Sequence, residues 1–453
     1  MIDGNTLIEM GYQPGPWFGK AISFANKYDL RGEDLKRYLM EVSPPPPIDP
    51  HCKPLRYFKN ISAVSANEKS NLAKVIRTMD AVMRTPTVVT GAIMPDACPA
   101  GPVGQIPVGG IVVTDNAIHP SMHGADICCS VAISIVENVT PKCILDSAQR
   151  ITHFGPGGRK VNTRKLLPRD ISDQIKNNKF LKDPKSSELA ETHLMTQGDG
   201  NHFLFVGQSK NTGKTCMVTH HGSRGLGARL FKSGMQVAEK FRKRISPRCP
   251  KLNAWIPFDT QEGKEYWEAL MTIREWTRLN HLLIHEEVAK NVGVDIVDWF
   301  WNEHNFVFKK DNLFYHAKGA TPLCDELIID STTDFRIIPL NMGQPILIVS
   351  GKATENNLGF APHGAGRNMS RSQHKRDNSN RSAEEILFEE IRDLDVRFYS
   401  GQIDISELPS AYKNAEIVKD QIQQFKLGTI EDEIIPYGCI MAGDWWKSTK
   451  WQN

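Results

Sequence analysis

The chain has 453 residues, of which 40% are hydrophobic and 24% charged, a composition typical of a globular protein rather than a disordered or fibrous one. The formal net charge of +3 neither requires nor excludes a nucleic-acid partner, because a local basic groove can lie within a nearly neutral total. No apolar run reaches the roughly 18 residues that a membrane span needs, so we expect no membrane association.

The first residues lack a basic segment followed by an apolar one, so we expect no secretory signal and a cytoplasmic protein. The nine cysteines are scattered and form no CxxC pair. This spacing argues against a disulfide framework and against a cysteine-rich zinc knuckle. We expect most of them to be buried thiols, with at least one available as a metal-binding thiolate.

Residues 1–45 predict a separate helical start, and the prolines from Pro44 to Pro47 predict a stiff, extended connector. Residues 67–84 predict a helix. From about 87 to 136, short β-branched runs alternate with Gly and Pro, as in strands. The segment 157–190 is basic and predicts loops.

Residues 262–292 have apolar side chains at spacings of three and four, which predicts a long amphipathic helix. The pattern after it predicts strands near 305–318 and 335–350, an exposed loop at 369–382, helices near 382–396 and 412–426, and an irregular aromatic tail. Strands and helices are mixed without a regular alternation, so we predict a compact α+β fold. The expected division is an extension with its connector at 1–60 and a catalytic domain at 61–453.

Five segments concentrate unusual polar residues: 123–129 (HGADICC), 198–203 (GDGNHF), 220–227 (HHGSRGLG), 303–305 (EHN) and 363–371 (HGAGRNMSR). A single histidine is more often a hydrogen-bonded structural residue than a ligand. Here several stand beside Gly or Asn, where a tight backbone can aim a side chain at a ligand. Asp, Cys and His together suit Zn, Mn, Co or Fe, whereas Ca and Mg prefer oxygen ligands. The number of candidate ligands favours two ions, which a thiolate could bridge.

Two of these segments, GSRGLG and HGAGR, place an arginine among glycines, and free backbone N–H groups beside a guanidinium form an anion cradle. Neither segment is a Walker A motif. His363 lies within the second cradle and is a candidate nucleophile, since an imidazole nitrogen can attack a nucleotide α-phosphate to give a phosphoramidate. Arg367 and Arg371 would then stabilise the developing phosphoryl charge.

In these segments the chain resembles the RtcB family of RNA ligases. HGADICCS is similar to the family's GxDxxC element, and GDGNHF, HHGSRGLG, EHNFVF and HGAGRNMSR match further elements in order. Three later segments also resemble family elements: HAKGATP (316–322) resembles HRKGAT, PLNMG (339–343) resembles PGSMG, and PSAYK (409–413) resembles PxAYK. The resemblance spans about 87 to 420, and it implies a single large RtcB-like domain with mixed or antiparallel sheets and flanking helices.

The resemblance implies specific roles. The ligands of two Mn²⁺ ions would be Asp126, Cys129, His202, His220 and His304, with Cys129 as the bridge. His363 would become guanylylated by GTP, and the nucleotide contacts would be Asn201, Gly364, Ala365, Gly366, Arg367 and Tyr412. The implied reaction joins RNA with a 3′-phosphate or 2′,3′-cyclic phosphate to RNA with a 5′-hydroxyl end, in repair or tRNA splicing. The resemblance leaves open whether a protein partner activates the reaction.

The departures from the family pattern gather on the guanine side. Phe205 stands where Glu is usual, Asn341 where Ser is usual, and Ala317 where Arg is usual. Cys128 replaces Gly, and His221 replaces Ser or Thr. Met441 or Ala442 stands near the position of a late Lys-Gly, for which Lys447 or Lys450 could substitute. This pattern predicts a divergent paralogue that keeps the metal and nucleophile residues.

Two other functions remain open. A metal-dependent 2′,3′-cyclic phosphoesterase without sealing activity would keep the metal ligands and tolerate the loss of nucleotide contacts. An RNA-binding relic would bind RNA without using His363. For RNA backbone contact, the candidates are two basic groups: Arg159, Lys160, Arg164 and Lys165, and Arg371, Lys375 and Arg376.

Overall fold

The computed structural model describes residues 1–328 and 330–447, and it is built around a twelve-stranded sheet. The strand order is β1-β2-β3-β10-β9-β5-β7-β6-β16-β13-β12, and β15 also pairs with β16. The strands are β1 (Phe58–Lys59), β2 (Val88–Cys98), β3 (Val108–Asp115), β5 (Cys129–Val136), β6 (Phe203–Ser209), β7 (Thr215–His221), β9 (Ile296–Lys310), β10 (Leu313–Lys318), β12 (Arg336–Pro339), β13 (Ile346–Ser350), β15 (Asp395–Phe398) and β16 (Thr429–Met441).

All pairings in this sheet are antiparallel except β1 with β2 and β15 with β16, which are parallel. Two small antiparallel ribbons accompany it: β4 (Ala117–Ile118) with β8 (Ile256–Pro257), and β11 (Ala320–Pro322) with β14 (Phe360–Pro362). The expected α+β fold with mixed or antiparallel sheets is confirmed.

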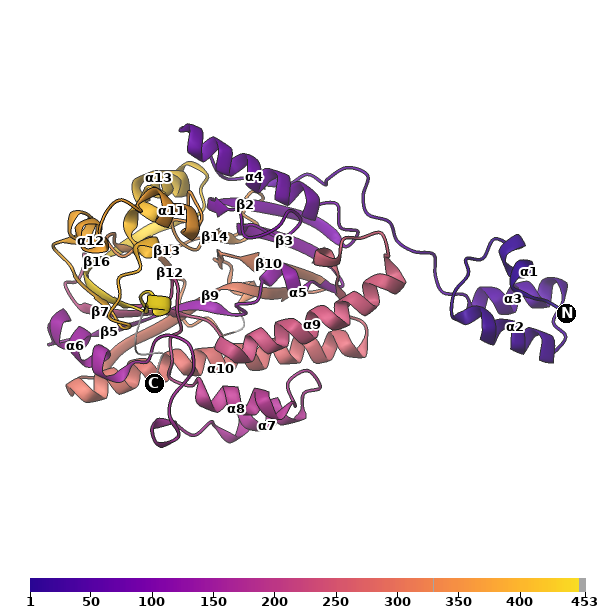
Figure 1. Ribbon diagram of the computed structural model, residues 1–453, viewed down its shortest axis with the longest axis horizontal. Coiled ribbons are helices and arrows are strands. Elements are labelled where there is room, and N and C mark those ends of the chain that lie inside the picture. The colour runs from indigo at the N-terminus through magenta and orange to yellow at the C-terminus, as the bar shows by residue number, and fades with distance from the viewer. Residues whose placement is uncertain (329, 448–453) are drawn as a thin grey trace.

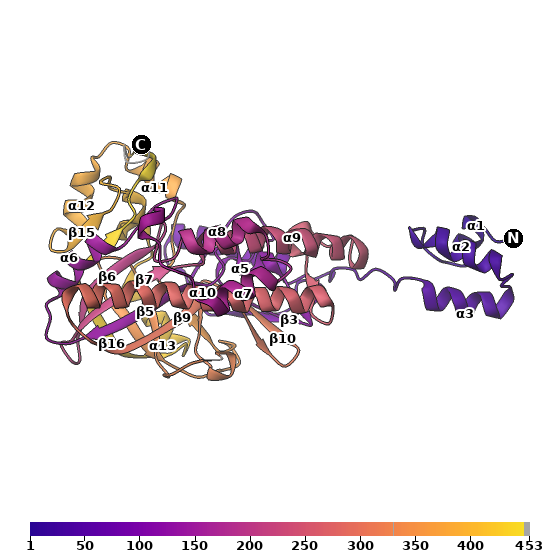
Figure 2. The same ribbon diagram turned by 90° about the horizontal axis from the view of Figure 1, so that it is seen from below.

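The helices lie around the sheet (Figures 1 and 2). They are α1 (Gly4–Glu9), α2 (Trp17–Lys27), α3 (Gly32–Val42), α4 (Ala66–Val82), α5 (Pro120–His123), α6 (Pro141–Ile151), α7 (Arg169–Asn177), α8 (Pro184–Thr192), α9 (Arg224–Ile245), α10 (Gln261–Val292), α11 (Arg371–Asp377), α12 (Ala383–Ile391) and α13 (Ala415–Gln424). No helix in the described part of the chain is long and apolar enough to cross a membrane.

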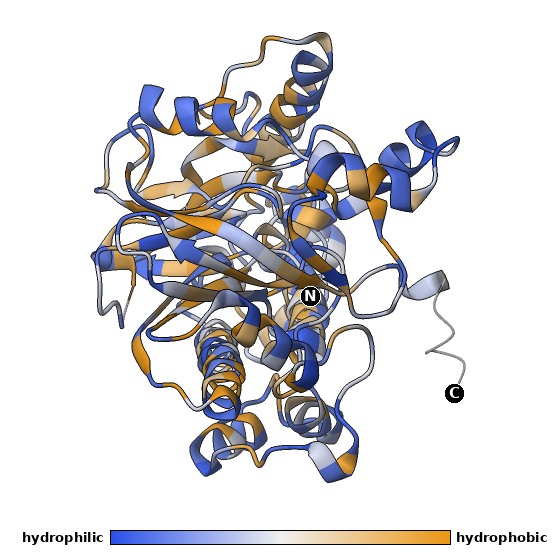
Figure 3. Cartoon of the chain, turned by 90° about the vertical axis from the view of Figure 1, so that its left-hand side faces the viewer, coloured by the Kyte–Doolittle hydropathy of each residue, from blue (hydrophilic) through white to orange (hydrophobic). Residues whose placement is uncertain are grey.

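The sheet has an apolar core on each face, which follows from the two-residue periodicity of its strands. On β5, Val131 and Ile133 enter a cluster that includes Ile386 of α12, whereas Val136 packs into the larger cluster with α6 and α10. Figure 2 shows α10 running across the strands on this second side, and Figure 3 shows hydrophobic residues gathered between the layers.

Helices α1–α3 lie apart from the rest of the chain at the end of an extended connector (Figure 1). Their core contains only their own residues: Ile2, Leu7, Phe18, Ala21, Ala25, Leu35 and Leu39. The connector first joins the larger body at Ile48, whose backbone exchanges hydrogen bonds with Ile245 and Ser246. The expected helical start is therefore present, while the domain boundary at residue 60 stays a prediction.

Several expectations from the sequence are wrong in detail. The loop expected at 369–382 contains α11, and the loops expected at 157–190 contain α7 and α8. The helix expected at 382–396 ends at Ile391, after which β15 begins at Asp395. The expected irregular tail is largely the thirteen-residue strand β16. Lys450 lies outside the described residues.

Candidate active site

The sheet order brings four of the five predicted ligands to neighbouring strands. His304 lies on β9, Cys129 begins β5, His220 lies on β7, and His202 immediately precedes β6. In the strand register Cys129 is paired with Asn305, and Phe203 with His220. The order β9-β5-β7-β6 therefore places these side chains next to one another, where β5, β7 and β6 begin or end beside the middle of β9, although they are far apart in sequence.

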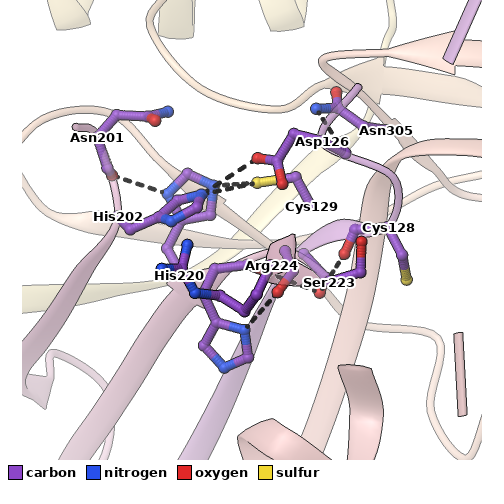
Figure 4. A network of polar contacts seen from close by, with 12 residues as sticks. Asp126, Cys128, Cys129, Asn201, His202, His220, Ser223, Arg224 and Asn305 are labelled. Atoms are coloured by element: carbon purple, nitrogen blue, oxygen red, sulfur yellow. Dashed lines mark hydrogen bonds and ion pairs between the residues drawn. The ribbon is translucent and has the colours of Figure 1, made fainter. Parts of the chain in front are cut away.

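The ligand atoms converge on Cys129 (Figure 4). Its Sγ lies 3.2 Å from His220 Nε2 and 3.6 Å from His202 Nε2. His202 Nε2 is also 3.2 Å from Asp126 Oδ2, and His220 Nε2 is 3.2 Å from His304 Nε2. Two groups result, Cys129–His220–His304 and Asp126–Cys129–His202, each with ligand atoms within 4.8 Å of one another. Cys129 belongs to both, which is the arrangement expected of a bridging thiolate.

Hydrogen bonding fixes which nitrogen of His220 faces this cluster. Its Nδ1 lies 3.1 Å from the carbonyl oxygen of Asn201, which can only accept, so Nδ1 carries the proton of the neutral ring. Burial lowers the pKa of His220 to about 3, so the ring is neutral near pH 7. Its Nε2 lone pair is therefore directed at Cys129 and His304, the tautomer that a metal-binding histidine requires.

The turn before β5 is held in a conformation that side chains rarely adopt. Cys128 has a φ of 57°, in the left-handed region that favours glycine. Its backbone N–H donates to Asn305 O at 2.7 Å, and Cys129 N–H donates to Asp126 O at 3.2 Å. These bonds fold Asp126 back over Cys129. The side chain of Cys128 is buried outside both ligand groups.

Gly222, which follows β7, lies directly against Asp126 of this turn. A Cβ at this position would lie 2.1 Å from Asp126 Oδ1, so any side chain would displace the carboxylate. Asp126 also accepts from His202, and although burial raises the pKa of Asp126, that hydrogen bond and charge lower it to about 2. The carboxylate is ionised at neutral pH and is available to a cation.

His363 follows β14 and stands beside the metal-ligand cluster, with its ring centroid 4.8 Å from that of His304. Its Nδ1 lies 2.5 Å from Asp96 Oδ2, and its backbone N–H donates to the same oxygen at 3.2 Å. The Asp96 side chain is fully buried, whereas that of His363 is 16% exposed. A carboxylate can only accept a hydrogen bond, so the ring N–H lies on Nδ1 and donates to Asp96, which leaves the lone pair on Nε2 as the nucleophile.

Lys413 holds Asp96 in place. Its buried Nζ donates to the carbonyl oxygens of Pro95 and Ala97, at 2.8 and 2.7 Å, on both sides of Asp96. The backbone N–H of Lys413 donates to Gly366 O at 3.0 Å. A Cβ on Gly366 would lie 1.9 Å from Asp96 O, so the HGAGR turn can approach this strand only through a glycine. The PSAYK segment thus joins the Asp96 strand to the His363 turn.

A second buried carboxylate, Glu407, organises the arginines. It accepts from Arg371 Nε at 2.5 Å and from Tyr412 Oη at 2.5 Å, and it lies 3.6 Å from Arg367 Nη1. The guanidinium of Arg367 also covers the Tyr412 ring at 5.1 Å. Arg371 keeps about half of its side chain exposed, so it remains available to a ligand.

A cavity of about 230 Å³ lies beside His363. One part of its lining is polar and contains Asn201, His220, His363, Arg367, Arg371, Glu407 and Tyr412, and Gly364, Ala365 and Gly366 also line it. The other part is apolar and contains Phe203, Phe205, Leu340, Met342, Ile346, Cys439 and Met441. All of the predicted nucleotide contacts therefore reach one cavity, and Phe205 and Met441 make one side of it hydrophobic.

The predicted RNA-binding loops are partly engaged in internal contacts. Arg159 donates to the carbonyl oxygens of Ile151 and Met195, and Lys165 pairs with Glu287 at 2.9 Å. Lys375 lies 3.1 Å from both Asp404 and Asp444. Lys165 and Lys375 remain partly exposed in these pairs, and RNA contact by either loop stays a prediction.

The comparisons with known proteins agree with this geometry. The sequence profile described as tRNA-splicing ligase RtcB matches residues 78–442. The chain belongs to the RtcB family. A tRNA-splicing ligase RtcB of Archaeoglobus fulgidus is 26% identical over 425 residues, covering 77% of this chain and 87% of the relative. One from Aeropyrum pernix is 25% identical over 413 residues, covering 73% and 84%.

Three residues of this RtcB site were not singled out from the sequence: Asp96, Lys413 and Glu407. Asp96 is the only acidic residue in the buried strand β2, and an acid within an apolar run is the signal that could have drawn attention to it. Lys413 is the last residue of the PSAYK segment and Glu407 lies just before it. The groups that they contact, such as the carbonyl oxygens of Pro95 and Ala97 and the guanidinium of Arg371, lie in other elements. Their roles depend on contacts that no local pattern contains.

Proposed function

We propose that this RtcB-family protein is a metal-dependent RNA ligase in which His363 is guanylylated by GTP. The observation that carries the proposal is the position of His363: Asp96 holds its Nδ1 at 2.5 Å, and its ring adjoins His304 at the edge of the cysteine-centred ligand cluster. A nucleophile oriented by a carboxylate beside a metal centre fits transfer of a nucleotidyl group.

The residues present fit two Mn²⁺ ions. One group brings the Cys129 thiol and the imidazoles of His220 and His304 within 4.8 Å of one another, and the other brings together the Asp126 carboxylate, the Cys129 thiol and the His202 imidazole. We propose Cys129, His220 and His304 for one ion and Asp126, Cys129 and His202 for the other. When bound, the ions would supply Lewis-acid stabilisation of phosphoryl charge.

In the proposed first step, the Nε2 lone pair of His363 attacks the α-phosphorus of GTP, a P–N bond forms, and the bond to the departing pyrophosphate breaks. Asp96 accepts a hydrogen bond from Nδ1–H and stabilises the positive charge that develops on the ring. Arg371 is half exposed at the same cavity and is placed to stabilise charge on the phosphate oxygens. The guanylate then passes to an RNA 3′-phosphate, from which a 5′-hydroxyl displaces GMP.

The joining reaction is tested with two labelled RNA strands, one ending in a 2′,3′-cyclic phosphate and one beginning with a 5′-hydroxyl. We expect a joined product only when Mn²⁺ and GTP are both present, and none from His363→Ala. His374→Ala is a matched control, since His374 lies on α11 and contacts Ser410 rather than the ligand cluster. Joining that persists in His363→Ala would exclude the proposed intermediate.

The hydrophobic lining at Phe205 and Met441 favours a second candidate, a 2′,3′-cyclic phosphoesterase that opens the ring without sealing. Such an enzyme would need the metal centre but no base-specific nucleotide contacts. The same experiment separates the two functions, because accumulation of 3′-phosphate ends without joined product, and without a requirement for GTP, would support the esterase.

We place the reaction in residues 61–453 and treat 1–60 as an accessory extension. The cysteines in the described chain are free thiols, so we propose that the protein works in the cytoplasm. Its substrate would be RNA, and the separate helices α1–α3 would be available to a protein partner.

A further inference from the structure

A second pocket, distinct from the active site, lies where the connector meets the larger body. It is formed by Pro50 and His51 of the connector, the C-terminal half of α4 with Thr85, and the segment Arg248–Asn253. It shares no lining residue with the cavity beside His363. Because the RtcB profile begins at residue 78, the connector wall of this pocket belongs to the part of the chain outside the family match.

The rim of this pocket is rich in arginine. Arg77, Arg84 and Arg248 line it, against one acidic lining residue, Asp80. Asp80 is already engaged, because it accepts from Tyr57 Oη at 2.9 Å. Arg248 pairs with Asp49 at 2.7 Å in a solvent-exposed contact that a bound anion could compete with. The lining therefore keeps an excess of positive charge.

The arginines come from separate segments and are partly fixed. Arg84 donates from Nη1 to Cys52 O, which anchors its guanidinium against the connector and leaves further N–H groups for another acceptor. Arg77 has an exposed side chain, and no described residue forms an ion pair or hydrogen bond with it. A guanidinium of this kind suits bidentate contact with phosphate oxygens.

Two residues of the pocket lining carry buried polar atoms without a partner. Thr85 and Asn253 are each 1% exposed, and neither Thr85 Oγ1 nor the two amide atoms of Asn253 has a hydrogen-bond partner among the described residues. His51 Nε2 is likewise unpartnered. Since buried polar groups are normally satisfied, the presence of these atoms in the lining of one pocket supports a polar ligand. Asn253 needs both an acceptor and a donor, which a phosphate oxygen and a ribose hydroxyl would provide.

We propose that this pocket binds the phosphate and ribose of a ribonucleotide. The three arginines would bind the phosphate, and Thr85 and Asn253 would contact oxygen and hydroxyl groups in the pocket. The pocket has a volume of about 750 Å³, within the range of nucleotide-sized sites. The ribonucleotide can belong to an RNA strand that also reaches the active site, or it can be a free mononucleotide.

The test measures binding of two probes to the Mn²⁺-loaded, full-length protein: a labelled 20-nucleotide single-stranded RNA by fluorescence anisotropy across a salt series, and AMP by calorimetry. The variants are Arg77→Gln, on the surface of α4, and Asn253→Asp, which places a negative charge in the pocket lining at nearly constant volume. Lys74→Gln is the control, because Lys74 is an exposed base on the same helix outside the pocket lining.

For an RNA strand, we expect both variants to weaken RNA binding at least five-fold and Arg77→Gln to lower the salt slope by about one, with Lys74→Gln within two-fold of the parent. Loss of AMP binding in both variants with unchanged RNA affinity would support the free mononucleotide. Both affinities staying within two-fold of the parent in Arg77→Gln would overturn the proposal, whether or not Asn253→Asp folds. Guanylylation of His363 is expected to be unchanged in these variants, so this result is separate from that of the proposed ligase reaction.

Discussion

At the scale of single residues, the orientation of His363 depends on Asp96. We predict that Asp96→Asn slows formation of the His363 adduct about 100-fold, because the amide cannot stabilise the positive ring and can favour the wrong tautomer. Adduct formation followed by intact mass over time measures this rate. Asp115→Asn, an exposed substitution at the end of β3, should leave it unchanged. An equal rate in Asp96→Asn would show that the contact has no role in the chemistry.

Gly222 gives a second prediction at this scale. Gly222→Ala places a methyl group against Asp126 and should weaken binding of Mn²⁺ at least ten-fold, with loss of bound metal after dialysis. Elemental analysis of the purified protein gives the metal content. Gly19→Ala is the matched control, because no atom lies within 4 Å of a Cβ at that helical position. Full metal content in Gly222→Ala would remove Asp126 from the ligand set.

The sequence was most informative about residues whose chemistry is local. His363, Cys129 and the other ligands stand in short segments with Gly or Asn beside the reactive residue, and the structure brings these side chains close together. Asp96 was missed because it is 267 residues away from His363 and interrupts an otherwise apolar strand. Lys413 was missed because its function is to bind two backbone carbonyl groups, which have no sequence signature.

At the scale of elements, a buried ion pair joins α10 to β9 behind the ligand cluster. Arg274 contacts Glu303 and Asp330, and the side chains of Arg274 and Glu303 are 7% and 1% exposed. We predict that Arg274→Met lowers the free energy of unfolding by about 3–5 kcal/mol, because it leaves the Glu303 carboxylate buried and unpaired next to His304.

Arg278→Met supplies the control for this prediction. Arg278 also contacts Asp330 and lies over Trp299, as Arg274 lies over Trp301, but its side chain is 42% exposed. Its loss should cost about 1 kcal/mol or less. Urea unfolding of both variants measures the difference. Equal costs would mean that burial of the Glu303 charge does not determine the stability of this junction.

Long periodic elements were predicted well and short or interrupted ones were not. The spacing of apolar residues located α10 to within one residue at its start, because 32 residues average out local exceptions. The strand β16 was missed because Glu431, Asp432 and Glu433 are polar and because Pro436 and Gly438 interrupt it at a bulge. Its acids are paired with residues of other elements, including Ser209, Lys210 and Lys419, which a linear pattern cannot reveal.

At the scale of the whole molecule, buried neutral histidines make stability depend on pH. Burial lowers the pKa of His119 and His285 to about 3 and that of His123 to about 4. In the unfolded chain these groups bind protons near pH 6.5, whereas in the folded chain they stay neutral. The unfolded state therefore takes up more protons, and stability falls as pH decreases from 6.5 toward 4.

Once the pH is below about 6, these three groups alone predict a loss of about 4 kcal/mol per pH unit, and His220, whose pKa burial also lowers to about 3, adds to it in the metal-free protein. The free energy of unfolding of the metal-free protein, measured in urea at pH 7.0, 6.0 and 5.0, tests the expectation. Carboxylates with lowered pKa, such as Asp126, do not contribute in the measured range, because they stay ionised in both states above about pH 5. A flat profile from pH 7 to pH 5 would show that these histidines are charged or hydrated in the folded protein.

The central claim is that the ligand cluster and His363 act together as a guanylylation site. The most direct test is the intact mass of the protein after incubation with Mn²⁺ and GTP, beside parallel samples with ATP, with chelator and with His363→Ala. We predict a gain of one GMP that requires Mn²⁺ and GTP and is absent from His363→Ala. No adduct with either nucleotide in fully metal-loaded protein would contradict the account.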